Sequence, residues 1–199
     1  MTVDKHQPPI ILASSSPRRR QLLSEAGYKF TVVEPDVDES AFPTERIAAS
    51  EYAKTLALAK AKNVAAAHPE ALIIGADTVV DSAGEIIGKP TDAKNAERIT
   101  RKLFGAPHKV ITAIAIVRLC DRTQIVQSDS TTVYPKPMTD GQIEEHIKSG
   151  TWRGKAGAYA IQETGDKFVD KIDGSLTNVM GLPMELLKIL LTGRSPKNP

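Results

Sequence analysis

Residues 14–20 read Ser-Ser-Ser-Pro-Arg-Arg-Arg and follow a short apolar run, which is the order expected where a strand turns into a helix. Ser16 is typical of a helix N-cap, and Pro17 of the first helical position. Free backbone N–H groups and the positive end of the helix dipole attract anions there, and Arg18 and Arg19 add charge in the first turn. The stretch therefore predicts a phosphate site. The alternative is a solvated arginine face on an ordinary capped helix.

Two acidic residues are candidates for metal and proton chemistry. Asp77 lies inside the apolar run 71–80, where an unpaired buried carboxylate would be costly, so it must be paired, bound to a metal or placed at a cleft. Glu39 lies in the acidic loop 35–40. Two carboxylates together with substrate phosphates are a usual way of holding Mg²⁺. The alternatives are a structural aspartate that caps a turn and an exposed acidic loop.

Two lysines are candidate phosphate partners. Lys60 lies on an alanine-rich helical segment, where a solvated lysine is the alternative, and Lys89 is held between Gly88 and Pro90. The run 84–90 differs from a P-loop because three residues rather than four separate its glycines. Pro90 also disfavours a helix starting at Lys89.

Composition limits the classes of function. The chain has 199 residues, 41% of them hydrophobic, with a net charge of +2 and 5% aromatic residues. Binding of duplex nucleic acid is not indicated by this charge, and single-strand binding through the arginines would need more aromatic side chains. Cys120 is the only cysteine, so no intrachain disulfide can form, and its apolar surroundings predict a packed side chain. We see no signal peptide or membrane span and expect the cytoplasm.

The elements that must position these residues alternate between strands and helices. We expect an α/β fold with a mixed, twisted sheet flanked by helices and a cleft fed by several loops. One domain spans 10–192, with an N-terminal extension at 1–9 and a flexible tail at 193–199. The patterns predict strands at 10–13, 29–34, 71–80, 85–87, 110–119, 124–133, 158–161 and 168–172, and helices from residue 17, over 44–67 and 93–103, and from residues 139 and 182.

Five separated segments together resemble one family, the Maf family of nucleoside triphosphate pyrophosphatases. They are Ser-Ser-Ser-Pro-Arg-Arg at 14–19, Gly-Ala-Asp-Thr at 75–78, Gly-Lys-Pro at 88–90, Lys-Ala-Gly-Ala-Tyr-Ala-Ile-Gln at 155–162 and Val-Met-Gly-Leu-Pro at 179–183. The resemblance implies an inosine-triphosphatase-like fold with a cleft between two lobes, dependence on a divalent metal cation (Mg²⁺ or Mn²⁺) and, in many members, a homodimer. It also implies cleavage of a nucleoside triphosphate between the α- and β-phosphorus.

Within that family, arginine, threonine and glutamine at the positions of Arg18, Thr78 and Gln162 mark the branch that acts on dTTP and UTP, with modified pyrimidine triphosphates as further candidates. The alternatives are a 7-methyl-GTP pyrophosphatase, which has tryptophan and glutamine at the first two positions, and a non-catalytic nucleotide-binding regulator of cell division.

The resemblance and the residues together suggest a role for each candidate. Asp77 is the expected proton acceptor, and with Glu39 it would position the metal and the attacking water. Thr78 and Gln162 would bind the pyrimidine. The triphosphate would be held by Ser14, Arg18, Arg19, Lys60 and Lys89.

Overall fold

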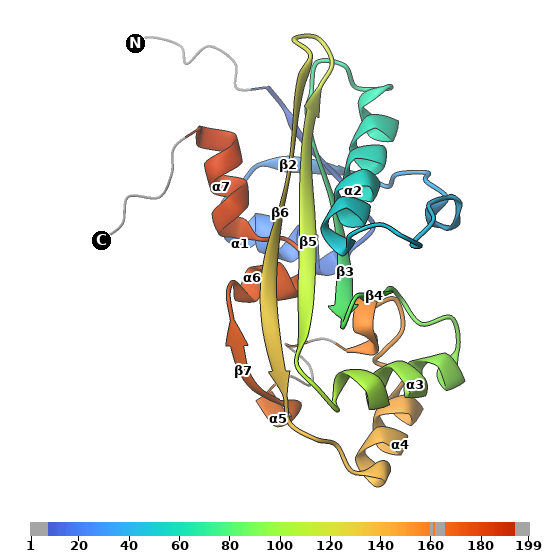
Figure 1. The fold of residues 1–199 in the computed structure, drawn as a ribbon. Coiled ribbons are helices and arrows are strands. Elements are labelled where there is room, and N and C mark those ends of the chain that lie inside the picture. Colours follow the sequence, from blue (N-terminus) through green and yellow to red (C-terminus); the bar gives the residue numbers. More distant parts are fainter. Residues whose placement is uncertain (1–7, 160, 162–165, 194–199) are drawn as a thin grey trace.

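The computed structural model describes residues 8–159, 161 and 166–193 (Figure 1). Its strands are β1 (Ile10–Ala13), β2 (Phe30–Val33), β3 (Leu72–Ser82), β4 (Glu85–Ile87), β5 (His108–Arg118), β6 (Thr123–Pro135) and β7 (Val169–Asp173). Its helices are α1 (Pro17–Glu25), α2 (Ala49–Ala65), α3 (Ala93–Leu103), α4 (Asp140–Ser149), α5 (Asp166–Phe168), α6 (Leu176–Met180) and α7 (Met184–Thr192), with 3₁₀ turns η1 (Glu39–Ala41) and η2 (Ala156–Ala158). Across these ranges no helix combines the length and the apolar character needed to cross a bilayer.

The described strands form one mixed sheet in the order β2-β1-β3-β5-β6-β7, and β4 also pairs with β3. The first three strands along this path are parallel, because helices α1 and α2 connect them, whereas β3, β5, β6 and β7 are antiparallel neighbours. The predicted α/β fold with a mixed sheet is confirmed.

Three apolar clusters surround this sheet. Helix α2 packs its alanine-rich side on one face of the upper part, while α1, α6 and α7 cover the opposite face (Figure 1). A third cluster holds α3, α4 and η2 against the lower ends of β3, β5 and β6. The long strands therefore run through both an upper and a lower lobe.

Strand pairing is interrupted along the edge of β3 that faces away from β5. Strand β1 pairs with β3 as far as Ala13↔Gly75, and β4 begins to pair only at Val80↔Ile87. The four residues 76–79 have no strand neighbour on that edge. The loops that leave β1 and β4 therefore flank an opening in the sheet, and Asp77 and Thr78 lie in the middle of it.

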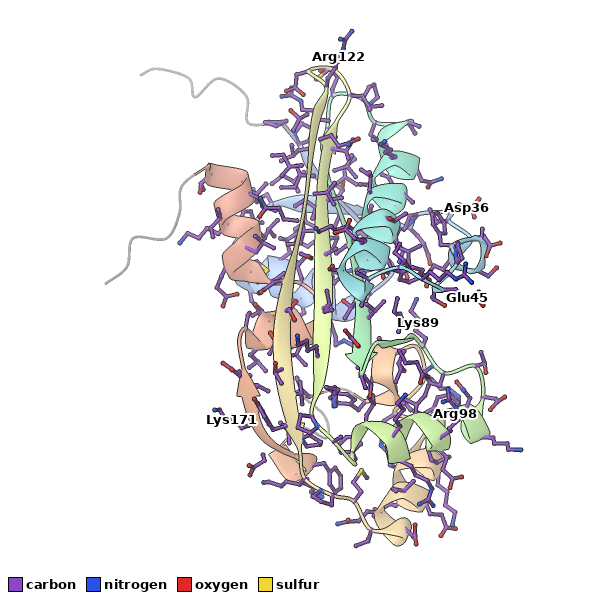
Figure 2. The ribbon with its side chains drawn as sticks, viewed as in Figure 1. Asp36, Glu45, Lys89, Arg98, Arg122 and Lys171 are labelled. Carbon is purple, nitrogen blue, oxygen red and sulfur yellow. The ribbon has the colours of Figure 1, made fainter. Side chains whose placement is uncertain are left out.

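The structure corrects four local predictions. The helix predicted over 44–67 begins only at Ala49, because Arg46 adopts a left-handed backbone (φ 60°) and Ala48 is extended. The strand predicted at 158–161 is wrong where it is described, since Ala158 ends a 3₁₀ turn with φ 63°. Helix α6 was not predicted. Cys120 is exposed rather than packed, because the β5–β6 hairpin turns there; Arg122 marks this end of the hairpin in Figure 2.

Candidate active site

The opening beside β3 leads into a cavity of about 600 Å³. Its walls come from the β1–α1 turn, η1, α2 and β3 of the upper lobe, from α6, and from the β4–α3 loop and residues 153–159 and 161 below. Figure 2 shows Lys89, on the β4–α3 loop, between the part that carries α2 and the part that carries α3 and α4. Eight of the predicted site residues line this one cavity: Ser14, Arg18, Arg19, Glu39, Lys60, Asp77, Thr78 and Lys89. The ninth, Gln162, lies outside the described residues.

Two carboxylates share one buried ammonium group. The Lys60 Nζ lies 2.5 Å from Asp77 Oδ1 and 2.8 Å from Glu39 Oε1. The side chains of Lys60 and Asp77 are only 9% and 7% exposed, whereas that of Glu39 is 38% exposed. Lys89 Nζ donates to both oxygens of Glu39 at 3.1 Å. The carboxylates and lysines thus form a continuous charge cluster from the sheet to the cavity mouth.

The packing of α2 on β3 explains how Lys60 reaches Asp77. A Cβ at Gly75 would collide with the carbonyl oxygen of Ala57 and with Ala61, so only glycine permits this close approach. Lys60 then lies on the inner side of α2, facing the strand. Glu39 is held separately, because Asp38 caps η1 by accepting from the Ser40 backbone N–H at 3.0 Å.

The two carboxyl groups have pKa values shifted in opposite directions. Burial raises the pKa of Asp77, and the opposing charges of Lys60 and Arg19 do not cancel that effect. Burial acts on Glu39 as well, but hydrogen bonds and charges from Lys60 and Lys89 outweigh it and lower the pKa of Glu39. Asp77 is therefore a better proton acceptor than an ordinary aspartate, since burial makes its carboxylate more basic.

The upper wall of the cavity contains the residues of the predicted phosphate site. Ser16 caps α1 by accepting from the Arg19 backbone N–H at 3.4 Å, and Ser14 Oγ accepts from the Ser16 backbone N–H at 3.1 Å. The capping prediction is confirmed, with Pro17 at the first helical position. Arg18 and Arg19 leave this turn half-buried and line the cavity.

Arg19 is fixed by contacts with the end of α6 and with β3. Its Nε donates to the Gly181 carbonyl at 2.7 Å, and its Nη2 donates to Thr78 Oγ1 at 3.1 Å. Burial lowers the pKa of Arg19, while Asp77 acts against this change. Asp77 and Thr78 are consecutive in a strand and therefore point to opposite faces, the first toward α2 and the second toward α1.

Three further wall residues were not among the predicted site residues. Arg153 and Lys155 bring positive charge from the lower lobe, and Tyr159 supplies an aromatic surface. The Tyr159 hydroxyl is hydrogen-bonded to His108 Nε2 at 2.8 Å, and burial raises its pKa, so it stays protonated. The segment 155–162, which contains Lys155 and Tyr159, is one of the five segments that carry the family resemblance, whereas nothing in the sequence singled out Arg153.

The described lining residues carry an excess of positive charge. Six are basic and three are acidic. The basic residues are Arg18, Arg19, Lys60, Lys89, Arg153 and Lys155, and the acidic ones are Glu34, Glu39 and Asp77. A polyanion as highly charged as a triphosphate complements this excess.

The donor set partly matches a divalent cation. Within the described residues there is no group of three or more His, Cys, Asp or Glu side chains able to hold a metal. Glu39 and Asp77 nevertheless place carboxylate oxygens within hydrogen-bond distance of a single cation, the Lys60 ammonium. Two carboxylates suit Mg²⁺, which usually completes its six ligands with water and substrate phosphate. The two carboxylates therefore fit a divalent cation only if water and substrate phosphate supply its remaining ligands.

Comparison with known proteins identifies similar chains along almost the full length. The family model for Maf-like protein matches residues 9–194. A dTTP/UTP pyrophosphatase of Geotalea uraniireducens is 46% identical over 88% of this chain and 89% of its own, and one of Bdellovibrio bacteriovorus is 39% identical over 94% and 98%. The solved structure of the Staphylococcus aureus Ham1 protein has a similar fold, with a TM-score of 0.54 and 13% identity over 93% of this chain and 98% of that one.

Proposed function

The chain belongs to the family of Maf-like proteins, and we propose that it hydrolyses nucleoside triphosphates, dTTP and UTP in particular, to the monophosphate and pyrophosphate. One observation carries this proposal more than any other: a buried basic carboxylate, Asp77, lies in the same cavity as the arginines of a helix N-terminus. The relatives that are 39–46% identical bear the name dTTP/UTP pyrophosphatase, which supports the choice of substrate.

In the proposed reaction, water attacks the α-phosphorus and the bond to the bridging oxygen breaks, so that pyrophosphate leaves. Asp77 accepts the proton of the attacking water, for which its raised pKa suits it. Charge on the leaving pyrophosphate is stabilised by the positive groups that already line the cavity, namely Arg18, Arg19 and Lys89. Arg19 and Lys89 already have hydrogen-bond partners in Gly181, Thr78 and Glu39, so these two side chains need little reorganisation.

Lys60 has a different part in this scheme. Its ammonium holds the Asp77 and Glu39 carboxylates in fixed positions and partly neutralises them, which allows a polyanion to approach. Glu39 and Asp77 are the residues that would hold Mg²⁺ or Mn²⁺. Such an ion would supply Lewis-acid polarisation of the phosphate oxygens and a more acidic bound water.

Base selection is proposed for Thr78 and Gln162. Thr78 lines the cavity beside Arg19. A hydrogen-bonding site discriminates because an ill-matched base leaves buried polar groups unpaired. We also propose the cytoplasm as the compartment, since a single exposed thiol at Cys120 suits reducing conditions.

The test is product analysis with the purified full chain and Mg²⁺. UTP and dTTP should give UMP or dTMP together with one equivalent of pyrophosphate. The matched substrates are GTP and 7-methyl-GTP, which should react more slowly. Release of orthophosphate in place of pyrophosphate, or a preference for 7-methyl-GTP, would contradict the proposal.

A further inference from the structure

Behind the cavity wall, a fully buried asparagine joins α6 to β5. Asn178 Oδ1 accepts from the Thr112 backbone N–H at 3.1 Å. Its Nδ2 donates to the Val110 carbonyl at 2.9 Å and to Thr131 Oγ1 at 3.0 Å. Because the amide oxygen and both amide protons have partners, the side chain is held in one orientation. Neither Asn178 nor Thr112 is among the described residues that line the cavity.

The hydroxyl of Thr112 extends this network toward the cavity. Thr112 Oγ1 donates to the Asn178 carbonyl oxygen at 2.9 Å, and a hydroxyl has only one proton. Thr112 and Thr78 lie opposite each other on paired strands, with their hydroxyl oxygens 2.9 Å apart. Since the Thr112 proton is already used, Thr78 must be the donor in that pair. Its oxygen in turn accepts from Arg19 Nη2.

The hydrogen bonds therefore all run in one direction, from the Arg19 guanidinium through Thr78 and Thr112 to a buried carbonyl. Two consequences follow for the site. Thr78 can offer a ligand only an acceptor, because its single proton points away toward Thr112. Arg19 is held through Nε and Nη2, at Gly181 and Thr78, while its Nη1 has no hydrogen-bond partner among the described residues.

We propose that Thr112 and Asn178 are positioning residues, which hold Arg19 through Thr78 in the orientation that binds the phosphates. This inference rests on the proposed function, because it assigns Arg19 to the triphosphate. In this proposal the planar guanidinium of Arg19 binds phosphate oxygens through Nη1. Holding the guanidinium in place before the substrate binds lowers the entropic cost of ordering it on binding. Thr112 reaches the substrate only through two intervening side chains.

The first test replaces Thr112 with valine, which keeps the branched shape and removes the hydroxyl. Loss of one link in a coupled network should lower kcat/KM for UTP by about tenfold. Thr112→Ser keeps the hydroxyl and should stay within about twofold of wild type. The matched control is Thr100→Val in α3, because Thr100 is also fully buried and its hydroxyl also donates to a backbone carbonyl, that of Ala96, at 2.8 Å. Its melting temperature should fall and its kcat/KM should not.

A double-mutant cycle with Arg19→Lys separates positioning from simple support of the fold. Lysine cannot bind both the Gly181 carbonyl and Thr78 as the guanidinium does. Thr112→Val should therefore have less than about a twofold further effect in the Arg19→Lys background. A second tenfold loss there, or wild-type kcat/KM in the Thr112→Val single variant, would overturn the proposal.

Binding measurements keep the two proposals distinguishable. If the wild-type chain releases no pyrophosphate, the proposed function fails. The positioning role of Thr112 is then tested by calorimetric titration with α,β-methylene-UTP. Thr112→Val should then weaken binding by about tenfold, and Thr100→Val should not. Equal dissociation constants for wild type and Thr112→Val would overturn the proposed positioning role.

Discussion

Replacing Asp77 with asparagine tests the proposed chemistry most directly. Asparagine keeps the shape of the side chain but can neither accept the proton nor carry charge. Loss of a general base typically lowers the rate by about 10²–10⁴-fold, so kcat for UTP should decrease by a factor in that range. The structure offers a matched control in Asp81, a carboxylate on the same strand that accepts from the Gly84 backbone N–H at 2.8 Å in the β3–β4 turn. Asp81→Asn should retain activity within about twofold.

Asp77→Asn should lower the free energy of unfolding only moderately. Removing one partner of a buried ion pair costs about 3–5 kcal/mol when the other charge is left alone. Here Lys60 keeps Glu39 at 2.8 Å, and burial already disfavours the charged form of Asp77. We therefore expect a loss of about 3 kcal/mol or less, which lowers Tm by about 10 °C at most. The variant should stay folded at the assay temperature.

The raised pKa of Asp77 predicts how kcat/KM and folding stability each change with pH. A carboxyl with a raised pKa loses its proton at a higher pH than usual, so wild-type kcat/KM should fall as the pH drops through that raised value. Asp77→Asn should lack this acidic limb. Folding responds oppositely, because the native state binds more protons than the unfolded state between the two pKa values, and stability from this group falls as the pH rises through that window. The assignment would be refuted by a folded Asp77→Asn variant with more than about a tenth of wild-type kcat.

Three further outcomes are expected. Lys60→Gln removes a charge that lowers the pKa of Asp77, so the acidic limb of the kcat/KM profile should move to higher pH. The control is Lys54→Gln, on the solvent side of α2, which should leave that limb in place. An acidic limb that does not move in Lys60→Gln would contradict the coupling between Lys60 and Asp77. Gly75→Ala should cost about 1–3 kcal/mol in urea unfolding because its Cβ meets α2, while Gly141→Ala, where nothing lies within 4 Å, should be neutral or slightly stabilising. Pyrophosphate release should stop on dialysis against EDTA and return with Mg²⁺ or Mn²⁺, and activity that survives the chelator would argue against the metal role of Glu39 and Asp77.

Local chemistry explains which parts of the site could be predicted from the sequence. Ser16 and Pro17 specify the start of α1 through cap geometry alone, and an aspartate within an apolar strand indicates a cleft because its burial needs a partner. Both features depend on residues close in the chain, and the structure places them as predicted.

Contacts between distant segments explain what could not be predicted. The segment after Lys155 turns instead of forming a strand because Gly157 and Ala158 adopt positive φ, and the Gly157 N–H binds the Gly88 carbonyl at 3.1 Å. Helix α6 has only five residues, and its anchor, Asn178, bonds to strands far away in the chain. The joint use of Lys60 by two carboxylates likewise depends on how α2 packs, which no local pattern encodes.

The interruption along β3 has a mechanical consequence. Both rims of the opening are attached to the same uninterrupted strand, β1 at one end and β4 at the other. On its other side β3 pairs with β5, and β5 pairs with β6, without a break past the same point. No flexible linker therefore separates the rims, and any widening of the cavity must be absorbed as extra twist or bending of this three-strand ladder.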